Sequence, residues 1–201
     1  VGTSIFNNYT KEEIVDCLSA QREYRCIRDQ IGILDKMSVD EYQRQKQEAN
    51  IQRIRTVIKE DWLHGISQIQ NKNKELVWKT DELEFNWNAS AELTSIRKIT
   101  EHLKDNLEVH LLATDTAISV MATEIIYEAI NNCKIGNYSI KAFYDKDTYV
   151  IKGLQVKDRD NFVSKGMVNL VKTIESIASG YYDNCVLNIT GGYKAIIPYL
   201  T

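Results

Sequence analysis

A lysine follows two adjacent glycines near the end of the chain, in the run Thr190-Gly191-Gly192-Tyr193-Lys194. The apolar residues 184–189 before it predict a buried strand that is covered on both faces. Glycine accepts backbone conformations closed to other residues and lets a ligand approach the main chain. If a helix begins after the glycines, its free N–H groups favour an anion, and Lys194 then indicates a phosphate. Such turns also serve packing alone, which would leave Lys194 a solvated surface lysine.

The composition sets limits on the class of protein. With 201 residues, 43% hydrophobic and 26% charged, the chain is long enough for one well-buried domain of ordinary globular composition. A formal net charge of −3 argues against a general nucleic-acid or duplex-binding protein but allows a small anion in a local pocket. We find neither a membrane-spanning run nor a secretory signal, and we expect no membrane partner within this chain.

Cysteine and histidine provide no sign of a metal site. The spacing of the cysteines fits no set of metal ligands and predicts buried free thiols in a reducing, hence cytoplasmic, compartment. The histidines are scattered, and we expect neither a metal nor a cofactor. These residues are Cys17, Cys26, Cys133 and Cys185, and His64, His102 and His110.

The first part of the chain is predicted to be helical. Capping-box patterns at Thr10 and Ser38 open one helix that reaches Gly32 and a second that reaches Ile69. The centre of the second, residues 41–55, is so polar that we expect a projecting or partly solvated element.

Strands alternate with helices in the second part. Another helix is expected to begin within residues 88–92. The strands are expected at 108–113, 138–143, 148–152 and 184–189, with helices at 117–131 and about 160–177. This order predicts a Rossmann-like α/β fold, with a mainly parallel sheet, helices on both faces and a helical insertion.

In such sheets ligands bind beyond the carboxyl ends of the strands. That rule brings four loops to one edge of the sheet. They are Gly2-Thr3-Ser4, Thr114-Asp115-Thr116, Gly153-Leu154-Gln155 and Thr190-Gly191-Gly192-Tyr193-Lys194.

These loops, in this order, resemble the CARF domain (CRISPR-associated Rossmann fold) of type III CRISPR ancillary proteins. The likeness also rests on the Ala-Ser-Ala-Glu helix opening at residues 89–92, on Asn188-Ile189 before the glycines, and on the series Gly153, Asp158, Phe162, Gly166. It covers most of residues 1–201 as a single domain, although the helical segment of about 35–80 matches only loosely. Family members have a strand before the first loop and another after the last. We therefore expect a fragment, or one domain of a larger protein.

The resemblance implies a sensor that binds cyclic oligoadenylate, the antiviral second messenger, as a ring of four or six adenylates. It also implies a homodimer with the ring across the two-fold axis, where two identical half-sites suit a symmetric ligand. Carried over by motif, Gly2, Thr3 and Ser4 would contact phosphate and ribose, and Lys194 would contact a phosphate. The ligand-binding set expected on this basis comprises Gly2, Thr3, Ser4, Ile5, Asn7, Thr114, Asp115, Thr116, Gly153, Leu154, Gln155, Thr190, Gly191, Gly192, Tyr193 and Lys194.

Several of these residues also have a purely structural interpretation. Ser4 could be a helix or turn cap, and Asp115 or Thr116 could cap the next helix, which we favour for them. Gln155 could bind an adenine edge or be a simple loop amide. Tyr193 could stack on a base or cover the core.

An enzyme is the alternative. CARF-type ring nucleases cut their ligand without metal, as a ribose 2′-hydroxyl attacks the adjacent phosphate and leaves a 2′,3′-cyclic phosphate. Ser4 and Lys194 would be the catalytic residues, by positioning and charge stabilisation. Two other enzyme classes are disfavoured. Arg97 and His102 match an Arg-x4-His nuclease pattern but share no helix face well, and no Gly-x-Gly-x-x-Gly motif indicates a dinucleotide enzyme.

Overall fold

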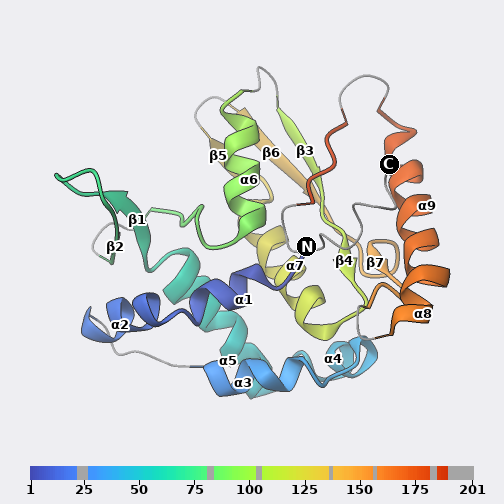
Figure 1. Ribbon diagram of the computed structural model, residues 1–201, viewed down its shortest axis with the longest axis horizontal. Coiled ribbons are helices and arrows are strands. Elements are labelled where there is room, and N and C mark those ends of the chain that lie inside the picture. Colours follow the sequence, from blue (N-terminus) through green and yellow to red (C-terminus); the bar gives the residue numbers. More distant parts are fainter. Residues whose placement is uncertain are drawn as a thin grey trace.

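Two parallel strand pairs form the centre of the second half of the chain (Figure 1). The computed structural model describes residues 1–21, 27–80, 84–102, 106–135, 138–155, 158–181 and 185–189. β3 (Leu107–His110) pairs with β6 (Tyr138–Phe143), and β4 (Ala113–Thr114) pairs with β7 (Val150–Ile151), both in parallel. β5 (Lys134–Ile135) adds to β6 in the antiparallel sense. The mainly parallel sheet predicted from the sequence is confirmed.

We call residues 107–114, which comprise β3, β4 and the two residues between them, the central strand, and its alternate residues face two different layers. Leu111 and Ala113 belong to the main core with α7 (Ala117–Ile130), whereas Leu112 packs against a second apolar cluster that includes α9 (Met167–Ala178). Successive residues of a strand point to opposite faces of the sheet. Helix α7 therefore covers one face and α9 covers the other. The fold is therefore α/β and Rossmann-like, as the alternation of elements predicts.

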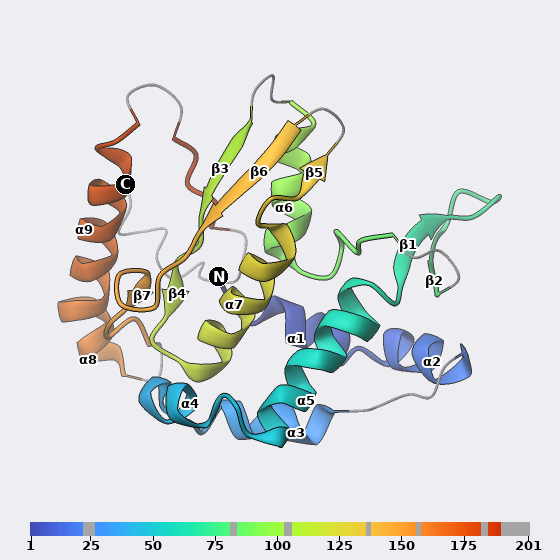
Figure 2. The same cartoon turned by 180° about the vertical axis from the view of Figure 1, so that it is seen from behind.

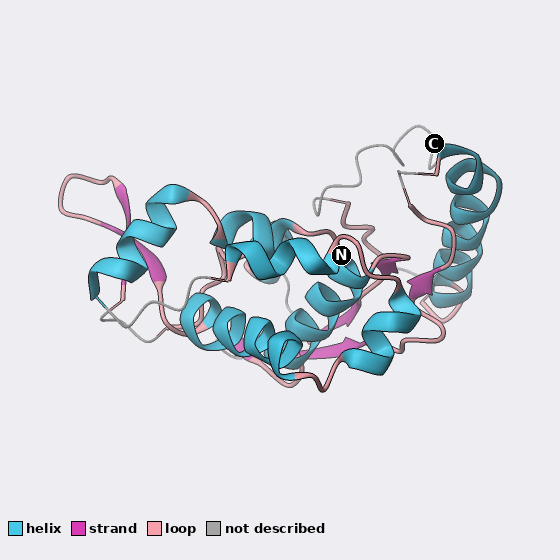
Figure 3. Cartoon of the chain, turned by 90° about the horizontal axis from the view of Figure 1, so that it is seen from below, coloured by secondary structure: helices cyan, strands magenta, loops and turns pink. Residues whose placement is uncertain are grey.

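Helices and one hairpin form the first part of the chain (Figure 2). The hairpin lies at one end of the elongated molecule and α9 at the other (Figure 3). The elements are α1 (Ser4–Tyr9), α2 (Glu12–Gln21), α3 (Arg28–Leu34), α4 (Val39–Gln45), α5 (Ala49–Val57), the π-helix η1 (Ile58–Leu63) and the strands β1 (Ser67–Gln70) and β2 (Leu76–Lys79).

The two long helices predicted here are shorter than expected. Helix α2 ends at Gln21, and α3 is a separate helix that runs past Gly32 to Leu34. Ser38 does cap a helix, because its hydroxyl accepts the N–H of Glu41 at 3.1 Å, but helical structure ends at Leu63 rather than at Ile69. The reason is Gly65. A Cβ there would lie 2.5 Å from the carbonyl oxygen of Asp61, so only glycine allows the close turn that leads into β1.

The polar segment 41–55 does not project from the molecule. Tyr42, Ile51 and Ile54 are fully buried, and α4 and α5 lie against the helices of the core. Of the two alternatives, projection is wrong and partial solvation is confirmed, because a few apolar side chains along two short helices bury one face while polar residues on the other face are exposed.

Two further predictions need correction. The first predicted loop is shorter than Gly2-Thr3-Ser4, because α1 begins at Ser4 and buries Ile5, Phe6 and Tyr9. Residues 185–189 form no strand, and Val186 and Leu187 are 70% and 46% exposed. A strand requires a neighbour that satisfies its backbone groups, and within the described part of the chain none pairs with this segment.

The remaining helices begin where the sequence predicts. α6 (Ala91–Thr100) starts after Ser90, and α8 (Arg159–Asn161) leads through the π-helix η2 (Phe162–Gly166) into α9. Among the described helices, none is long and apolar enough to cross a membrane. Cys17 and Cys133 are half-buried and Cys185 is exposed, so the expected burial of the cysteines is wrong for these three.

Candidate functional site

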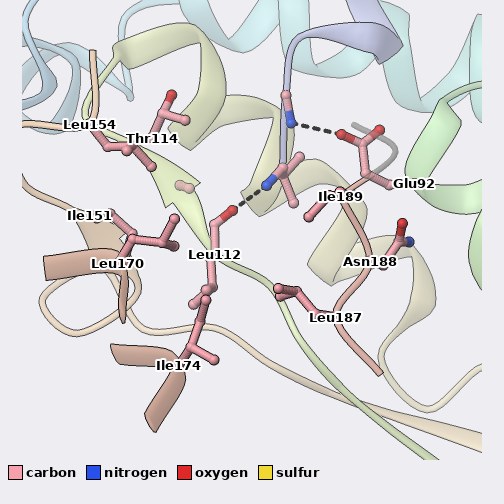
Figure 4. A pocket seen from close by; sticks show the side chains of 13 residues that line it. Glu92, Leu112, Thr114, Ile151, Leu154, Leu170, Ile174, Leu187, Asn188 and Ile189 are labelled. Carbon is pink, nitrogen blue, oxygen red and sulfur yellow. Dashed lines mark hydrogen bonds between the residues drawn. The ribbon is translucent and has the colours of Figure 1, made fainter. Parts of the chain in front are cut away.

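A small cavity lies at the carboxyl ends of β4 and β7 (Figure 4). Its volume is about 90 Å³, and it is bounded by the N-terminal residues, the start of α6, the central strand, α9 and the segment 187–189. Most of its lining is apolar. The lining residues are Val1, Gly2, Glu92, Leu112, Ala113, Thr114, Ile151, Leu154, Leu170, Ile174, Leu187, Asn188 and Ile189.

Glu92 fixes the first loop against α6. Ser90 caps α6 by accepting the N–H of Leu93 at 3.2 Å, which places Glu92 in the first turn of the helix. Its carboxylate accepts the N–H of Gly2 at 2.7 Å and the hydroxyl of Ser4 at 2.5 Å. The Ser4 oxygen in turn accepts the N–H of Ala91 at 3.1 Å. The Ala-Ser-Ala-Glu motif and the Gly-Thr-Ser loop are thus two halves of one hydrogen-bonded unit.

The environment of Glu92 keeps its carboxyl group ionised. Glu92 is only 6% exposed, and this burial disfavours the charged form of its carboxyl group. The hydrogen bonds from the Ser4 hydroxyl and the Gly2 N–H act against burial, and the pKa of Glu92 lies below its usual value. A buried negative charge therefore borders the cavity.

The loop after β4 is tied to the start of the chain by Ser119. The Ser119 hydroxyl donates to the carbonyl oxygen of Val1 at 2.6 Å and accepts the N–H of Thr114 at 3.0 Å. Thr116 is the N-cap of α7, because its side chain accepts the N–H of Ser119. The Val1 amino group donates to the carbonyl of Leu112, so the start of the chain lies beside the central strand.

Asp115 links two of the predicted loops and caps no helix. Its carboxylate accepts the N–H of Gly153 at 2.9 Å, and Gln155 donates its amide N–H to the Asp115 carbonyl. The capping role that we favoured for both Asp115 and Thr116 holds for Thr116 and is wrong for Asp115. The reason is that a carboxylate can accept a loop N–H from a neighbouring strand end as well as one from its own helix.

The motif that begins at Gly153 has a packing explanation. Gly153 has a φ of +80°, and a Cβ on Gly166 would lie 2.6 Å from the Gly153 carbonyl oxygen, so the two backbones are in contact. Asp158 caps α8 by accepting the N–H of Asn161 at 3.1 Å, and Phe162 is buried in the second apolar cluster. These residues shape the loop that carries Leu154 to the cavity.

The predicted binding residues are only partly brought together. Gly2, Thr114 and Leu154 line the cavity, whereas Ile5 is fully buried in the core and the amide of Asn7 donates to Thr3 outside it. Six others do not line the cavity: Ser4, which begins α1, and the loop residues Thr3, Asp115, Thr116, Gly153 and Gln155. The five residues Thr190, Gly191, Gly192, Tyr193 and Lys194 lie outside the described part of the chain.

Sequence reasoning missed Glu92 as a site residue. We had treated it only as part of a helix opening, although an acidic residue in a first turn is also free to bind donors from outside the helix. It also missed the apolar wall formed by Leu112, Ile151 and Leu170. The alternation of side chains along the strands would have indicated Leu112 and Ile151.

The Arg-x4-His pattern forms no site. Arg97 pairs with Glu101 at 3.9 Å on the surface of α6, and His102 is exposed at the end of that helix.

Comparison with known proteins gives one kind of match. The model of the family described as CRISPR-associated protein (Cas_APE2256) matches residues 87–201, from just before α6 to the last residue. No curated protein and no solved structure matches. The matched range includes Glu92 and the strand-end loops but not the loop Gly2-Thr3-Ser4.

Proposed function

Because the chain belongs to the CRISPR-associated protein (Cas_APE2256) family, we propose that it binds cyclic oligoadenylate as the sensor domain of an ancillary effector in type III CRISPR antiviral signalling. This would make it a CARF domain. Two observations support the proposal: the membership of this family and the resemblance of the strand-end loops to those of CARF domains.

One observation carries the proposal. Residues of three separate loops, Gly2, Thr114 and Leu154, line a single cavity at the carboxyl ends of β4 and β7, and Asn188 and Ile189 reach it just before the glycine-lysine motif. This is the position where α/β sheets bind nucleotides. The ring would lie on this edge, with its phosphates near Lys194.

The size of the cavity supports a shared site. At about 90 Å³ it is smaller than the roughly 300–1,000 Å³ of usual ligand pockets, so it can take only part of one nucleotide. A ring of four or six adenylates would extend beyond it. A homodimer, in which each protomer offers one such edge across the two-fold axis, would accommodate the whole ring.

A ring nuclease is the second candidate, and the Ser4–Glu92 contact favours it. That contact, at 2.5 Å, holds the Ser4 hydroxyl in a fixed orientation beside the cavity. In-line attack of a ribose 2′-hydroxyl requires such fixed positioning, and Lys194 would stabilise the charge that develops on the phosphate.

The test is incubation of the protein with labelled cyclic tetra- and hexa-adenylate in the presence of a metal chelator. Tight binding of an intact ring supports the sensor, and linear products that end in a 2′,3′-cyclic phosphate support the nuclease. No binding of either ring would overturn both.

Lys194→Ala is expected to weaken binding about 10- to 100-fold, because a charge-assisted hydrogen bond contributes about 1.5–3 kcal/mol. The matched control is Lys72→Ala, since Lys72 is an exposed lysine in the turn between β1 and β2. Equal affinities for the two variants would contradict the role of Lys194 in binding. A Lys194→Ala protein that binds normally but no longer cuts would assign the lysine to catalysis alone.

A further inference from the structure

Among the described residues that line the cavity, only Glu92 has a charged side chain. It is 94% removed from solvent, since its exposure is 6%. No Lys or Arg side chain of the described residues pairs with it; it accepts hydrogen bonds from the Gly2 N–H and the Ser4 hydroxyl. A negative charge in this position repels a phosphate and attracts a neutral hydrogen-bond donor.

The Glu92 carboxylate retains room for such a donor. An ionised carboxylate has about four acceptor positions on its two oxygens. Gly2 donates to Oε1 and Ser4 donates to Oε2, while the backbone N–H of Glu92 itself makes a further contact. At least one acceptor position is therefore left on this carboxylate, which lines the cavity.

The dimensions of the cavity favour a sugar over a base. A dry cavity of roughly 150 Å³ is known to hold a benzene ring, so about 90 Å³ is too small for a purine. Apolar side chains such as Leu112, Ile151 and Leu154 suit the carbon face of a ribose. In a ring of 3′,5′-linked adenylates the 2′-hydroxyl is the only unesterified sugar hydroxyl, and hence the only sugar donor.

We propose that Glu92 accepts a hydrogen bond from the ribose 2′-hydroxyl of one adenylate and thereby makes the site specific for ribonucleotide rings. The inference rests on the proposed function and adds that the sugar and the phosphates of the ring bind in different places. The cavity takes the sugar, and the phosphates remain outside it. The same carboxylate orients Gly2 and Ser4, so the loop and the sugar are fixed by one group.

The experiment compares cyclic tetra- and hexa-adenylate with their 2′-deoxy analogues, by calorimetry on the wild-type protein and on Glu92→Gln. The wild type is expected to bind the ribose ring at least tenfold more tightly than the deoxy ring. In Glu92→Gln this ratio is expected to fall below threefold, because the single amide oxygen is taken by Gly2 or Ser4. The ratio reports on the sugar even if the variant loses affinity for both rings.

Two controls separate the possible failures. Glu101→Gln changes an exposed glutamate on the surface of the same helix and should keep the wild-type ratio. A ring built from purine riboside, which lacks the adenine amino group, should be affected equally in wild type and Glu92→Gln. Unchanged discrimination in Glu92→Gln, equal wild-type binding of both sugars, or a loss specific to the amino group would overturn the role of Glu92 while the proposed function stands. No binding of any ring would overturn both.

Discussion

Two buried glutamates, one in α6 and one in α7, are held by different kinds of partner. Glu124 in α7 is 8% exposed and accepts hydrogen bonds from Arg55 at 2.6 Å and from Tyr42 at 2.7 Å, with Lys46 at 3.5 Å. Glu92 in α6 is equally buried but is held by a backbone N–H and a serine hydroxyl. Cationic side chains pair with the first carboxylate, whereas the second lines a cavity and has no Lys or Arg partner among the described residues. Two carboxylates that are equally buried therefore differ in the charge of their partners.

The Glu124 network explains how the helical part is attached to the α/β part. Tyr42 from α4 and Arg55 from α5 both reach Glu124, and Arg55 also bonds to Glu128 one turn further along α7. Burial, and after it the neighbouring Glu124 carboxylate, raise the pKa of Tyr42 well above its usual value, so it remains a hydroxyl donor. The network joins segments more than 60 residues apart.

The largest effect is expected for Arg55→Ala. Removing the guanidinium group leaves Glu124 charged and buried, with side-chain exposures of 13% for Arg55 and 11% for Glu124. Loss of one partner of a buried pair typically costs about 3–5 kcal/mol of unfolding free energy. Urea unfolding measures it. Arg97→Ala, an exposed arginine that pairs at 3.9 Å, should cost less than about 1 kcal/mol. Similar losses of unfolding free energy in Arg55→Ala and Arg97→Ala would contradict the distinction between a buried and an exposed ion pair.

Glu92→Gln should have a smaller effect, about 1–3 kcal/mol, because two hydrogen bonds to a buried acceptor are weakened without leaving a charge unpaired. Its signature is the pH dependence. Since folding lowers the pKa of Glu92, the stability gained from its ionisation is present above the unfolded value of about 4.3 and is lost as the pH falls through the folded value. The difference in unfolding free energy between wild type and Glu92→Gln should therefore shrink as the pH is lowered from 6 towards 3. A constant difference would show that folding does not lower the pKa of Glu92.

These two glutamates also show what the sequence could predict. Capping and strand patterns are local, so Ser38, Ser90 and the strand 138–143 were found at the expected places. Glu92 and Glu124 look alike in sequence, since each is an acidic residue within a helix. Their roles depend on partners about 90 and 70 residues away, which no local pattern specifies.

The strand predicted at 184–189 failed for the same kind of reason. An apolar, β-branched run fits a buried strand, but pairing depends on a neighbour that the run itself does not specify. The segment instead places Leu187, Asn188 and Ile189 at the cavity.

His110 is a third ionisable side chain whose partners can be compared. Like Glu92 it is held by neutral groups, in this case two hydroxyls, but it is less buried. Tyr181 donates to the Glu108 carboxylate, so it must accept from Nε2–H of His110, and Tyr149 then donates to Nδ1; each ring nitrogen lies 2.9 Å from its hydroxyl. Burial lowers the pKa of His110, although Glu108 acts in the opposite direction. A lowered folded pKa means that the unfolded chain binds the proton more readily.

Stability should accordingly fall as the pH drops below the unfolded histidine value of about 6.5. In His110→Gln the fall between pH 7.5 and 5.5 should be shallower, while His102→Gln, at an exposed histidine, should follow the wild type. Thermal unfolding at several pH values measures both. A wild-type slope in His110→Gln would show that the hydroxyl contacts do not depend on the neutral ring.

The smallest effect is expected at the edge of the Glu124 network. Lys59 donates to Glu128 at 2.8 Å, but both side chains are about 40% exposed, at 42% and 39%. Water and salt screen such a pair, so Lys59→Ala should cost less than about 1 kcal/mol, and less still at 1 M salt. Glu128 also pairs with Arg55, so the cost of Lys59→Ala should rise in an Arg55→Ala background, where Lys59 is the remaining cation for Glu128. Strict additivity in this double-mutant cycle would mean that Glu128 is already solvated and that the network ends at Glu124.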